Sequence, residues 1–430
     1  MQKRGGLRRR SPASWFTSGE TPVNTIVAIG GLAFLILIHE AGHFFTALAV
    51  RMRPRKFYIF FPPALAKWRR NGIEYGIGSI PLGGYVKIPG MHKPAAGDLE
   101  AHLEPARKEA PSLTAAEASV EQALVEERFD DARAELSELR ATVAGTELSE
   151  GARKVADRGL TDVDDGLSPE AYWRAPTSKR IAVILAGPAT NYLFAVLALA
   201  VVFMLGVPTG ATRVVEEVSA GSPAAAMGLQ PGDEVVAVNG TGGESADLAE
   251  AIRGSGGEPV TVTVERHGTE LDLEGTPQLD PADGVYRLGF AFGLDYETYG
   301  PLEALGLAFE STWEVTKAIV ASLGRLVTGE GRDEVASVVG ITAVSSDSLD
   351  VGFRYYLQVL AFISLSLALL NLLPLLPLDG GHIAFSIAER VRGRAIPREA
   401  YERFSMVGIA LVLVLFVIGL SNDIDRLSGG

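Results

Sequence analysis

The residues best suited to chemistry form the run His39-Glu40-Ala41-Gly42-His43, an HExxH pattern. On a helix, residues four apart share one face, so both imidazoles can reach one Zn²⁺ at about 2.0–2.1 Å. Glu40 lies beside them and can accept a proton from a water at the metal. With only six histidines in the chain, a chance occurrence is rare. The pattern predicts a zinc hydrolase, and the alternative is a buried polar network or a proton relay.

Two histidines need a third protein ligand if the fourth position is to hold water. Asp379 is the best candidate because it follows the apolar run Leu357–Leu378. Pro374 and Pro377 would loosen a helix near the metal, although they could also mark a simple helix end. His382 is expected to be a polar residue at the membrane edge rather than a ligand.

Substrate binding is expected near a glycine-rich run from Glu74 to Pro89, which follows the HExxH segment. Its alternation predicts a β-hairpin whose edge strand could hold an unwound substrate, while a plain connecting hairpin is the alternative. An asparagine near Asp379 could bind the substrate carbonyl or its oxyanion. The candidate substrate-binding residues are Asn371, Gly76, Ile77, Gly78, Gly83 and Gly84.

The composition points to a membrane protein. Charged residues make up 21% of the 430 residues, and the mean hydropathy is +0.20. The absence of cysteine excludes disulfides and thiolate metal sites. A bilayer span needs about 20 mostly apolar residues. The runs that meet this requirement are Val23–Val50, Ile181–Leu205, Leu357–Leu378 and Phe404–Leu420.

The first apolar run follows several basic residues and could be mistaken for a signal peptide. It is too long for that, no small-residue cleavage site follows, and Arg51, Arg53 and Arg55 close it. We therefore interpret it as a span.

The order of the spans along the chain places the candidate metal ligands on the same side of the membrane. The first and third spans run in the same direction, so their C-terminal ends reach the same side of the membrane. At 1.5 Å per residue, His39 lies roughly 24 Å beyond Val23, close to that side. Asp379, at the end of the third span, is expected at a similar depth.

The distribution of charge predicts the orientation. The net charge is −13, but basic residues gather near the spans on the active-site side, and the long connection 207–353 is mostly acidic. The positive-inside rule then places the active site toward the cytoplasm. The basic N-terminal tail would lie outside, against the rule. This charge pattern favours a membrane protein over a nucleic-acid binder. The basic residues near the spans on the active-site side are Arg51, Arg53, Arg55, Lys56, Arg174, Lys179, Arg180, Arg390, Arg392 and Arg394.

Two polar regions separate the spans. Residues 93–172 include an Ala/Glu/Arg-rich helical stretch, Ala115–Val143, and are expected to form a solvated helix pair or a partly disordered insert. The run 221–240 resembles bacterial PDZ domains, which bind a partner segment as an added strand. A β domain that only spaces the two halves is the alternative. Pro301–Thr328 has helical apolar spacing and could lie on the membrane or pack as an ordinary helix.

Several motifs together resemble the site-2 protease family of intramembrane zinc metalloproteases. They occur in this order over most of the chain: HEAGH, GIGSIPLGGYVK, AGPATN, the PDZ-like segment, SVVGI and NLLPLLPLDGG. The likeness is greatest to bacterial members with one PDZ domain that act in regulated intramembrane proteolysis. It implies that His39, His43 and Asp379 bind zinc, that Glu40 is the catalytic base and that the glycine-rich loop guides the substrate. It also implies single-span substrates within the lipid bilayer, such as anti-sigma factors or remnant signal peptides, and a peptide or substrate segment at the PDZ domain.

The expected fold is a polytopic α-helical membrane protein with about four transmembrane helices, a membrane-associated β-hairpin and an inserted α+β PDZ domain. Two other functions stay open: an HExxH peptidase that acts outside the bilayer, which would need its third ligand in a soluble segment, and an inactive scaffold that presents the PDZ domain. The expected boundaries are a basic tail at 1–22, span 1 at 23–50, the hairpin region at 51–92, the polar insert at 93–178, span 2 at 181–205, the PDZ domain at 207–295, an amphipathic region at 300–353, span 3 at 355–379 and span 4 at 404–420.

Overall fold

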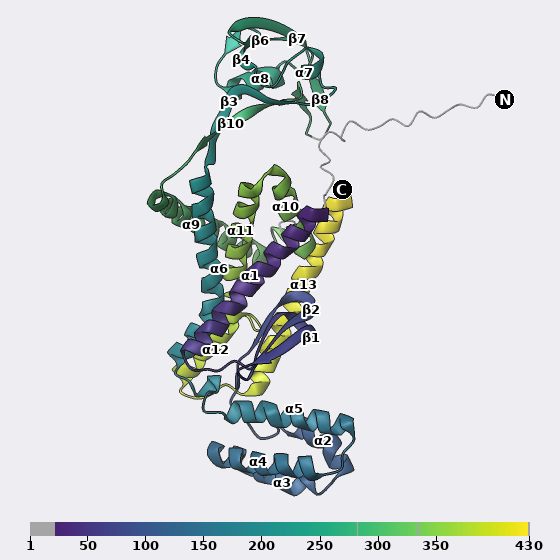
Figure 1. The fold of residues 1–430 in the computed structure, drawn as a ribbon, viewed down its shortest axis with the longest axis vertical. Helices are drawn as coiled ribbons and strands as arrows, with labels where there is room; N and C mark the ends of the chain where they lie inside the picture. Colours follow the sequence, from purple (N-terminus) through teal and green to yellow (C-terminus); the bar gives the residue numbers. More distant parts are fainter. Residues whose placement is uncertain (1–21, 282, 333–334, 429–430) are drawn as a thin grey trace, which may run out of the picture. The chain divides into compact units, whose positions relative to one another are not determined.

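The computed structural model describes residues 22–281, 283–332 and 335–428. The predicted basic tail lies outside this part of the chain, except for Pro22. The described residues form two compact units (Figure 1). One comprises residues 199–308, and the other comprises residues 22–198 and 309–428.

Four helices are long and apolar enough to cross a membrane among the described residues. At 1.5 Å per residue, the shortest of them, with 19 residues, spans about 28 Å, close to the thickness of a bilayer core. Large apolar side chains such as Ile26, Phe45, Leu193 and Val407 are more than half exposed, as expected where lipid replaces water. The four are α1 (Pro22–Ala49), α6 (Thr177–Leu205), α11 (Phe353–Asn371) and α13 (Arg398–Ser428).

The third span is shorter than predicted. It ends at Asn371 instead of continuing to Asp379, because Pro374 and Pro377 interrupt the helical hydrogen bonding. Asp379 instead begins a separate helix, α12 (Asp379–Arg392). The fourth span is longer than predicted and extends well beyond 404–420 at both ends.

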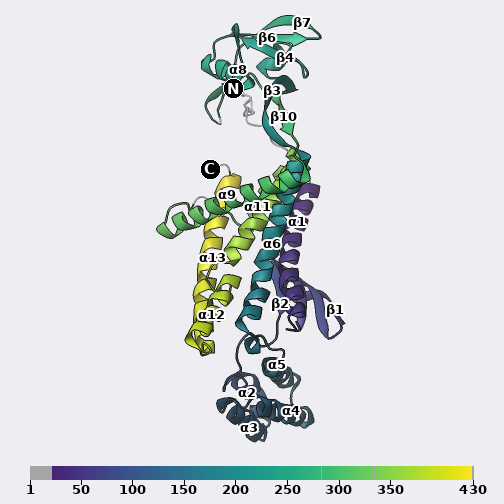
Figure 2. The same ribbon diagram turned by 90° about the vertical axis from the view of Figure 1, so that its left-hand side faces the viewer.

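An antiparallel pair of bent strands, β1 (Lys56–Arg70) and β2 (Ile73–Lys87), follows α1. The first residues of β1 pair with two parts of β2: Ile59 pairs with both Ile77 and Gly84. Asn71 and Gly72 both adopt positive φ in the turn between the strands. Both views show the strands beside the lower part of α1 (Figure 2).

The polar insert is neither a helix pair nor partly disordered, so that prediction was wrong. Four helices share a core of fully buried leucines. The predicted continuous stretch 115–143 is broken after Val125, where Glu127 adopts a left-handed conformation at φ 54°. The helices, with one core leucine each, are α2 (Glu100–Glu109; Leu103), α3 (Leu113–Val125; Leu113), α4 (Phe129–Gly145; Leu136) and α5 (Glu150–Leu167; Leu160).

Ion pairs join the insert to the strand pair. Asp165 of α5 accepts a hydrogen bond from Arg55 at 2.7 Å, and its neighbour Asp162 contacts Lys87 at 2.5 Å. Because Asp165 is largely buried, its pair with Arg55 is better shielded from solvent than an ordinary surface ion pair. The insert is therefore held against β2.

The unit at residues 199–308 contains a β-rich domain with its own apolar core, which includes Val235, Val262 and Leu248. Its main sheet has the order β10-β3-β4-β6-β7, with β5 paired to β4, while β8 pairs with β9. The last two strands, β9 and β10, are separated at Gly289, where φ is +84°. The elements are β3 (Val207–Val218), α7 (Pro223–Ala226), β4 (Glu234–Val238), β5 (Thr241–Gly242), α8 (Ser245–Gly254), β6 (Val260–Arg266), β7 (Thr269–Gly275), β8 (Gln278–Asp280), β9 (Val285–Arg287) and β10 (Phe290–Glu297).

A buried ion pair stabilises the β-rich domain. Both carboxylate oxygens of Asp233 accept hydrogen bonds from Arg266 at 2.7 Å. This guanidinium holds the pKa of Asp233 below its usual range.

Two further helices precede the third span. The first, α9 (Pro301–Thr328), coincides with the predicted amphipathic segment. The second is α10 (Val338–Val351), whose first turn is capped by Asp423 of α13. The Asp423 carboxylate accepts hydrogen bonds from the amides of Ser337 at 2.8 Å and Gly340 at 2.9 Å. The cap satisfies N–H groups that have no partner within the helix.

Candidate metal centre

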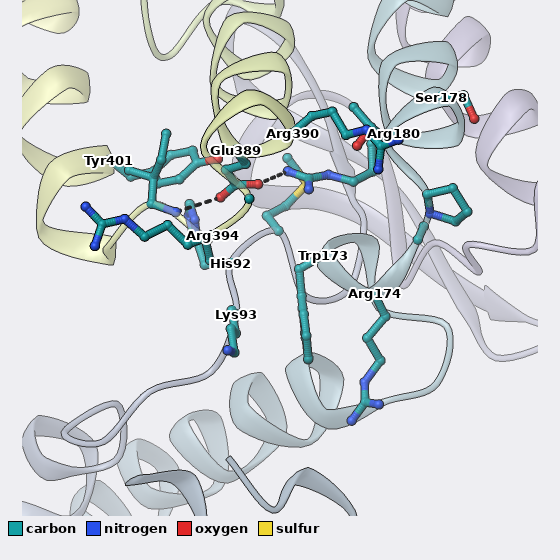
Figure 3. Close-up of a pocket in the computed structure, with 17 residues that line it drawn as sticks. His92, Lys93, Trp173, Arg174, Ser178, Arg180, Glu389, Arg390, Arg394 and Tyr401 are labelled. Atoms are coloured by element: carbon teal, nitrogen blue, oxygen red, sulfur yellow. Dashed lines mark hydrogen bonds and ion pairs between the residues drawn. The ribbon is translucent and has the colours of Figure 1, made fainter. Parts of the chain in front are cut away.

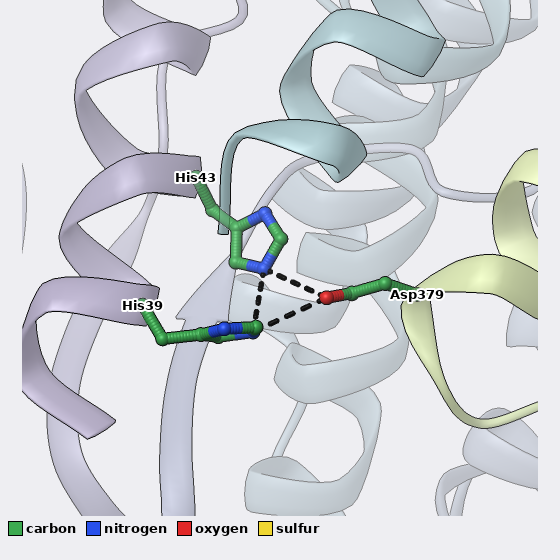
Figure 4. A group of neighbouring side chains, drawn as sticks. All are labelled: His39, His43 and Asp379. Carbon is green, nitrogen blue, oxygen red and sulfur yellow. Dashed lines mark hydrogen bonds and ion pairs between the residues drawn. The ribbon is translucent and has the colours of Figure 1, made fainter. Parts of the chain in front are cut away.

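Helix α1 presents His39 and His43 on one face, as their spacing predicts (Figure 4). Their ring centroids are 4.8 Å apart, and the two Nε2 atoms are 3.2 Å apart. The residues are only 9% and 7% exposed. Two imidazole nitrogens therefore converge in an environment with little access to solvent.

Asp379 approaches these nitrogens from the first turn of α12. Its Oδ2 atom lies 3.2 Å from Nε2 of His39 and 3.3 Å from Nε2 of His43. The two following glycines allow the tight turn: a Cβ on Gly380 would lie 2.2 Å from the carbonyl oxygen of Leu372. Larger residues would therefore push Asp379 away from α1.

A backbone carbonyl on α6 determines the tautomer of His43. Its Nδ1 lies 2.8 Å from the carbonyl oxygen of Val183, which can only accept, so Nδ1 carries the proton. The Nε2 atom of the neutral ring then presents a lone pair to His39 and Asp379. A carbonyl that orients a metal-binding histidine in this way is a common support of metal sites. The sequence could not identify Val183, because its backbone carbonyl makes this contact and its side chain does not.

The three atoms fit a zinc ion. A tetrahedral ion with bonds of about 2.0–2.1 Å separates its ligands by about 3.3–3.4 Å. The distances among the three atoms, 3.2–3.3 Å, agree with this spacing. Within the described residues, these three form the one group of at least three His, Cys, Asp or Glu side chains close enough to hold a metal ion. His382 is not part of it.

Glycines on α1 and α6 make room for the centre. A Cβ on Gly187 would lie 2.3 Å from Nε2 of His43 and 2.9 Å from Cε1 of His39. A Cβ on Gly42 would lie 2.4 Å from the carbonyl oxygen of Ala186. Gly187 therefore borders the imidazoles themselves.

The side chain of Asn191 forms no hydrogen bond to another helix among the described residues. Its amide atoms are buried with no hydrogen-bond partner among the described residues. Its backbone carbonyl instead accepts a hydrogen bond from the hydroxyl of Ser364 at 2.9 Å.

Glu40 lies against the second strand. A Cβ on Gly84 would lie 2.1 Å from Cγ and 2.8 Å from Oε1 of Glu40, so β2 passes directly beside this carboxylate. Gly84 thus lies beside Glu40, whereas a Cβ on Gly83 would meet the ring of Phe61. Gly76, Ile77 and Gly78 belong to the earlier part of β2, where a Cβ on Gly76 would meet the ring of Tyr58 and one on Gly78 the backbone of Phe61.

Asn371 is the last residue of α11, and its side-chain amide is engaged within that helix. Nδ2 donates to the carbonyl oxygen of Leu367 at 3.0 Å. The amide nitrogen carries a second N–H, which this bond does not use. The role of Asn371 in substrate binding stays a prediction.

A profile of peptidase family M50 matches residues 27–415. The chain belongs to this family. Among its relatives, zinc metalloprotease RasP of Geobacillus kaustophilus is 29% identical over 95% of this chain and 98% of that protein. The regulator of sigma-W protease RasP of Bacillus subtilis is 29% identical, over 94% and 99%. Metalloprotease MmpA of Caulobacter vibrioides is 28% identical, over 92% and 94%.

These similarities confirm the predicted family. The protein is a zinc metalloprotease, and zinc is its cofactor. Together with the four apolar helices, they support an integral membrane protein.

Proposed function

We propose that this protein is an intramembrane protease in which His39, His43 and Asp379 hold zinc and Glu40 is the catalytic base. It cleaves transmembrane segments of single-span membrane proteins. The observation that carries the proposal is the convergence of three ligand atoms at zinc spacing within a unit of membrane-spanning helices. Ionisable groups placed inside such spans are costly, and a catalytic role accounts for their presence.

Glu40 performs the proton transfers. When bound, zinc polarises the scissile carbonyl and makes a water molecule more acidic. The Glu40 carboxylate takes a proton from the attacking water and delivers it to the leaving amide nitrogen. The hydrogen bond from His43 to Val183 keeps that imidazole oriented toward the centre throughout.

Strand β2 is well placed to hold the substrate. An α-helical segment hides its amide bonds, so it must unwind before cleavage, and an extended segment can then pair with a strand edge. Gly83 and Gly84 have no side chain to block an approach, and Gly84 lies against Glu40. We propose that the substrate backbone pairs along this part of β2. Typical substrates would be anti-sigma-like proteins, in keeping with the name of the Bacillus subtilis relative, or remnant signal peptides.

The active site faces the cytoplasm in this proposal, and residues 207–297 lie outside. The basic residues that flank α1, α6 and α12 support this orientation. The chain has no cysteine, so single cysteines can report the topology. A membrane-impermeant maleimide should label exposed Thr241→Cys in intact spheroplasts and should label exposed Ser137→Cys only after lysis. The reverse pattern would overturn the orientation.

The β-rich domain is proposed to act as a PDZ domain that filters substrates. Its motif at 221–240 and its fold of short strands with α7 and α8 support this assignment. From the outer side, it would bind trimmed substrates and exclude those with bulky outer domains.

The decisive experiment compares the wild type with Glu40→Gln on a single-span reporter in cells, with zinc measured on both purified proteins. Glu138→Gln, an exposed position on α4, is the matched control. We expect cleavage to fall about 10³-fold in Glu40→Gln, because the proton acceptor is lost. Zinc should remain at about one ion per chain, since three ligands remain.

Two results would contradict the proposal. If the wild type holds no zinc, the inactive scaffold becomes the better interpretation. If Glu40→Gln still cleaves the reporter at the rate of Glu138→Gln, Glu40 is not the base.

A further inference from the structure

A cavity that none of the three candidate metal ligands lines lies at the beginning of α6 (Figure 3). Its volume is about 660 Å³, within the range of small-molecule sites. It lies where the insert joins the membrane helices. The lining residues come from segments before and after the insert, from the first turn of α6, from the end of α12 and from the loop that leads to α13.

The lining carries an excess of positive charge. Glu389 is the single carboxylate among the lining residues, and both its oxygens are engaged. Oε2 accepts from Arg180 at 2.6 Å and Oε1 from the amide of Ile396 at 3.0 Å. The lining cations are Lys93, Arg174, Arg180, Arg390 and Arg394.

Three of these cations lack a carboxylate partner. Lys93 is paired with Glu127 at 2.8 Å. The guanidinium of Arg174 lies over the Trp173 ring at 4.9 Å. For Arg174, Arg390 and Arg394, no carboxylate of the described chain lies within ion-pair distance. The lining of the cavity is therefore positively charged overall.

We propose that this cavity binds the phosphate of an anionic phospholipid headgroup. Guanidinium groups bind phosphate oxygens through paired N–H donors, which makes arginine the usual residue for such anions. Basic pockets between membrane helices are suited to anionic headgroups. Trp173 and Tyr401 flank the cavity, and such aromatic residues favour the headgroup level of a bilayer.

The position of the cavity, at the beginnings of two candidate spans, favours a lipid over a soluble phosphate compound. Two of the candidate spans, Thr177–Leu205 and Glu399–Arg426, begin at its wall, where Thr177 and Tyr401 line it. The apolar stretches that follow extend into the hydrocarbon core. A phosphate in the cavity would therefore lie at headgroup depth, with acyl chains free to run along α6 and α13.

The test is a thermal-stability titration of the purified full-length protein in a neutral detergent. The probes are dihexanoyl phosphatidylglycerol, dihexanoyl phosphatidylcholine, glycerol phosphate and inorganic phosphate. Only phosphatidylglycerol should raise the unfolding temperature of the wild type, since ligand binding to the folded state stabilises it. Arg390→Gln/Arg394→Gln should weaken its apparent affinity about 30-fold, or about fivefold for each cation removed.

The matched control is Lys179→Gln/Arg392→Gln. It removes two exposed charges, one on the first turn of α6 and one at the last residue of α12, and neither residue lines the cavity. It should respond to phosphatidylglycerol like the wild type. An equal loss in both double variants would show a general charge effect and would overturn the site. No shift with phosphatidylglycerol, or an equal shift with glycerol phosphate or inorganic phosphate, would overturn the lipid assignment.

Discussion

The β-rich domain and the metal centre differ in how far apart in the sequence their parts lie. In the domain, strands pair within residues 207–297, and its two ends meet because Val207 pairs with Glu297. The ligands of the centre come from α1 and from the start of α12, near opposite ends of the chain. The domain requires only contacts within its own segment, whereas the centre requires α1, α6 and α12 to pack together first.

The two regions also differ in what sets their packing distances. The domain is held by a core of side chains such as Val262 and Leu248, which can adjust to a change at the surface. Around the centre, three positions have no side chain at all: Gly42, Gly84 and Gly187 each bring a backbone to within contact of a neighbouring element. The comparison therefore predicts that the centre tolerates added volume far less than the domain does.

The largest effect is expected for Gly187→Ala. The new Cβ would lie under 3 Å from both imidazoles, so His39 and His43 must shift. We expect zinc affinity to fall about 10–100-fold, as when the support of a metal ligand is removed. Activity should fall about 10²-fold, as for small displacements of catalytic groups. Zinc affinity is measured by competition with a chelator, and activity on the single-span reporter.

Gly30→Ala is the control for that prediction. It adds the same methyl group to the helix that carries both histidines, where no atom lies within 4 Å of the new Cβ. It should match the wild type in zinc affinity and cleavage. Wild-type zinc affinity in Gly187→Ala would remove the argument that glycine sets the geometry of the centre.

The sequence was sufficient for those parts of the centre that depend on local spacing. The four-residue interval between His39 and His43 and the shared depth of Asp379 follow from helix geometry and span parity. Val183 could not be predicted, because any residue supplies the same carbonyl. The specific role of Gly187 was also hidden, since a glycine on a membrane helix is equally expected for ordinary helix packing.

The insert shows a different limit of sequence reasoning. Its helical propensity was recognised, but its core was not, because the buried leucines are spread over four short helices. No glycine or proline marks the break between α3 and α4; it falls at Glu127, in a conformation that residues other than glycine seldom adopt. The shortened third span, in contrast, agrees with the alternative that Pro374 and Pro377 mark a helix end.

Removal of the β-rich domain is expected to affect the metal centre little. It is expected to affect the selection between substrates strongly. Because Val207 and Glu297 are paired, a short Gly-Ser linker can replace residues 207–297 without stretching the chain. Zinc content should be unchanged, since the three ligands and Gly187 lie outside the excised segment. If the domain filters substrates, the ratio of cleavage rates for a trimmed and an untrimmed reporter should fall toward one.

The measurement pairs this ratio with the zinc content of the same purified protein, so that loss of the filter can be told apart from loss of the centre. Wild-type selectivity after excision would show that the domain is not the filter, while leaving the proposed chemistry intact. Loss of zinc after the excision would instead contradict the independence of the two regions, because the centre would then depend on a region that contributes none of its ligands. Retained zinc with lost selectivity is the result that a separately folded domain predicts.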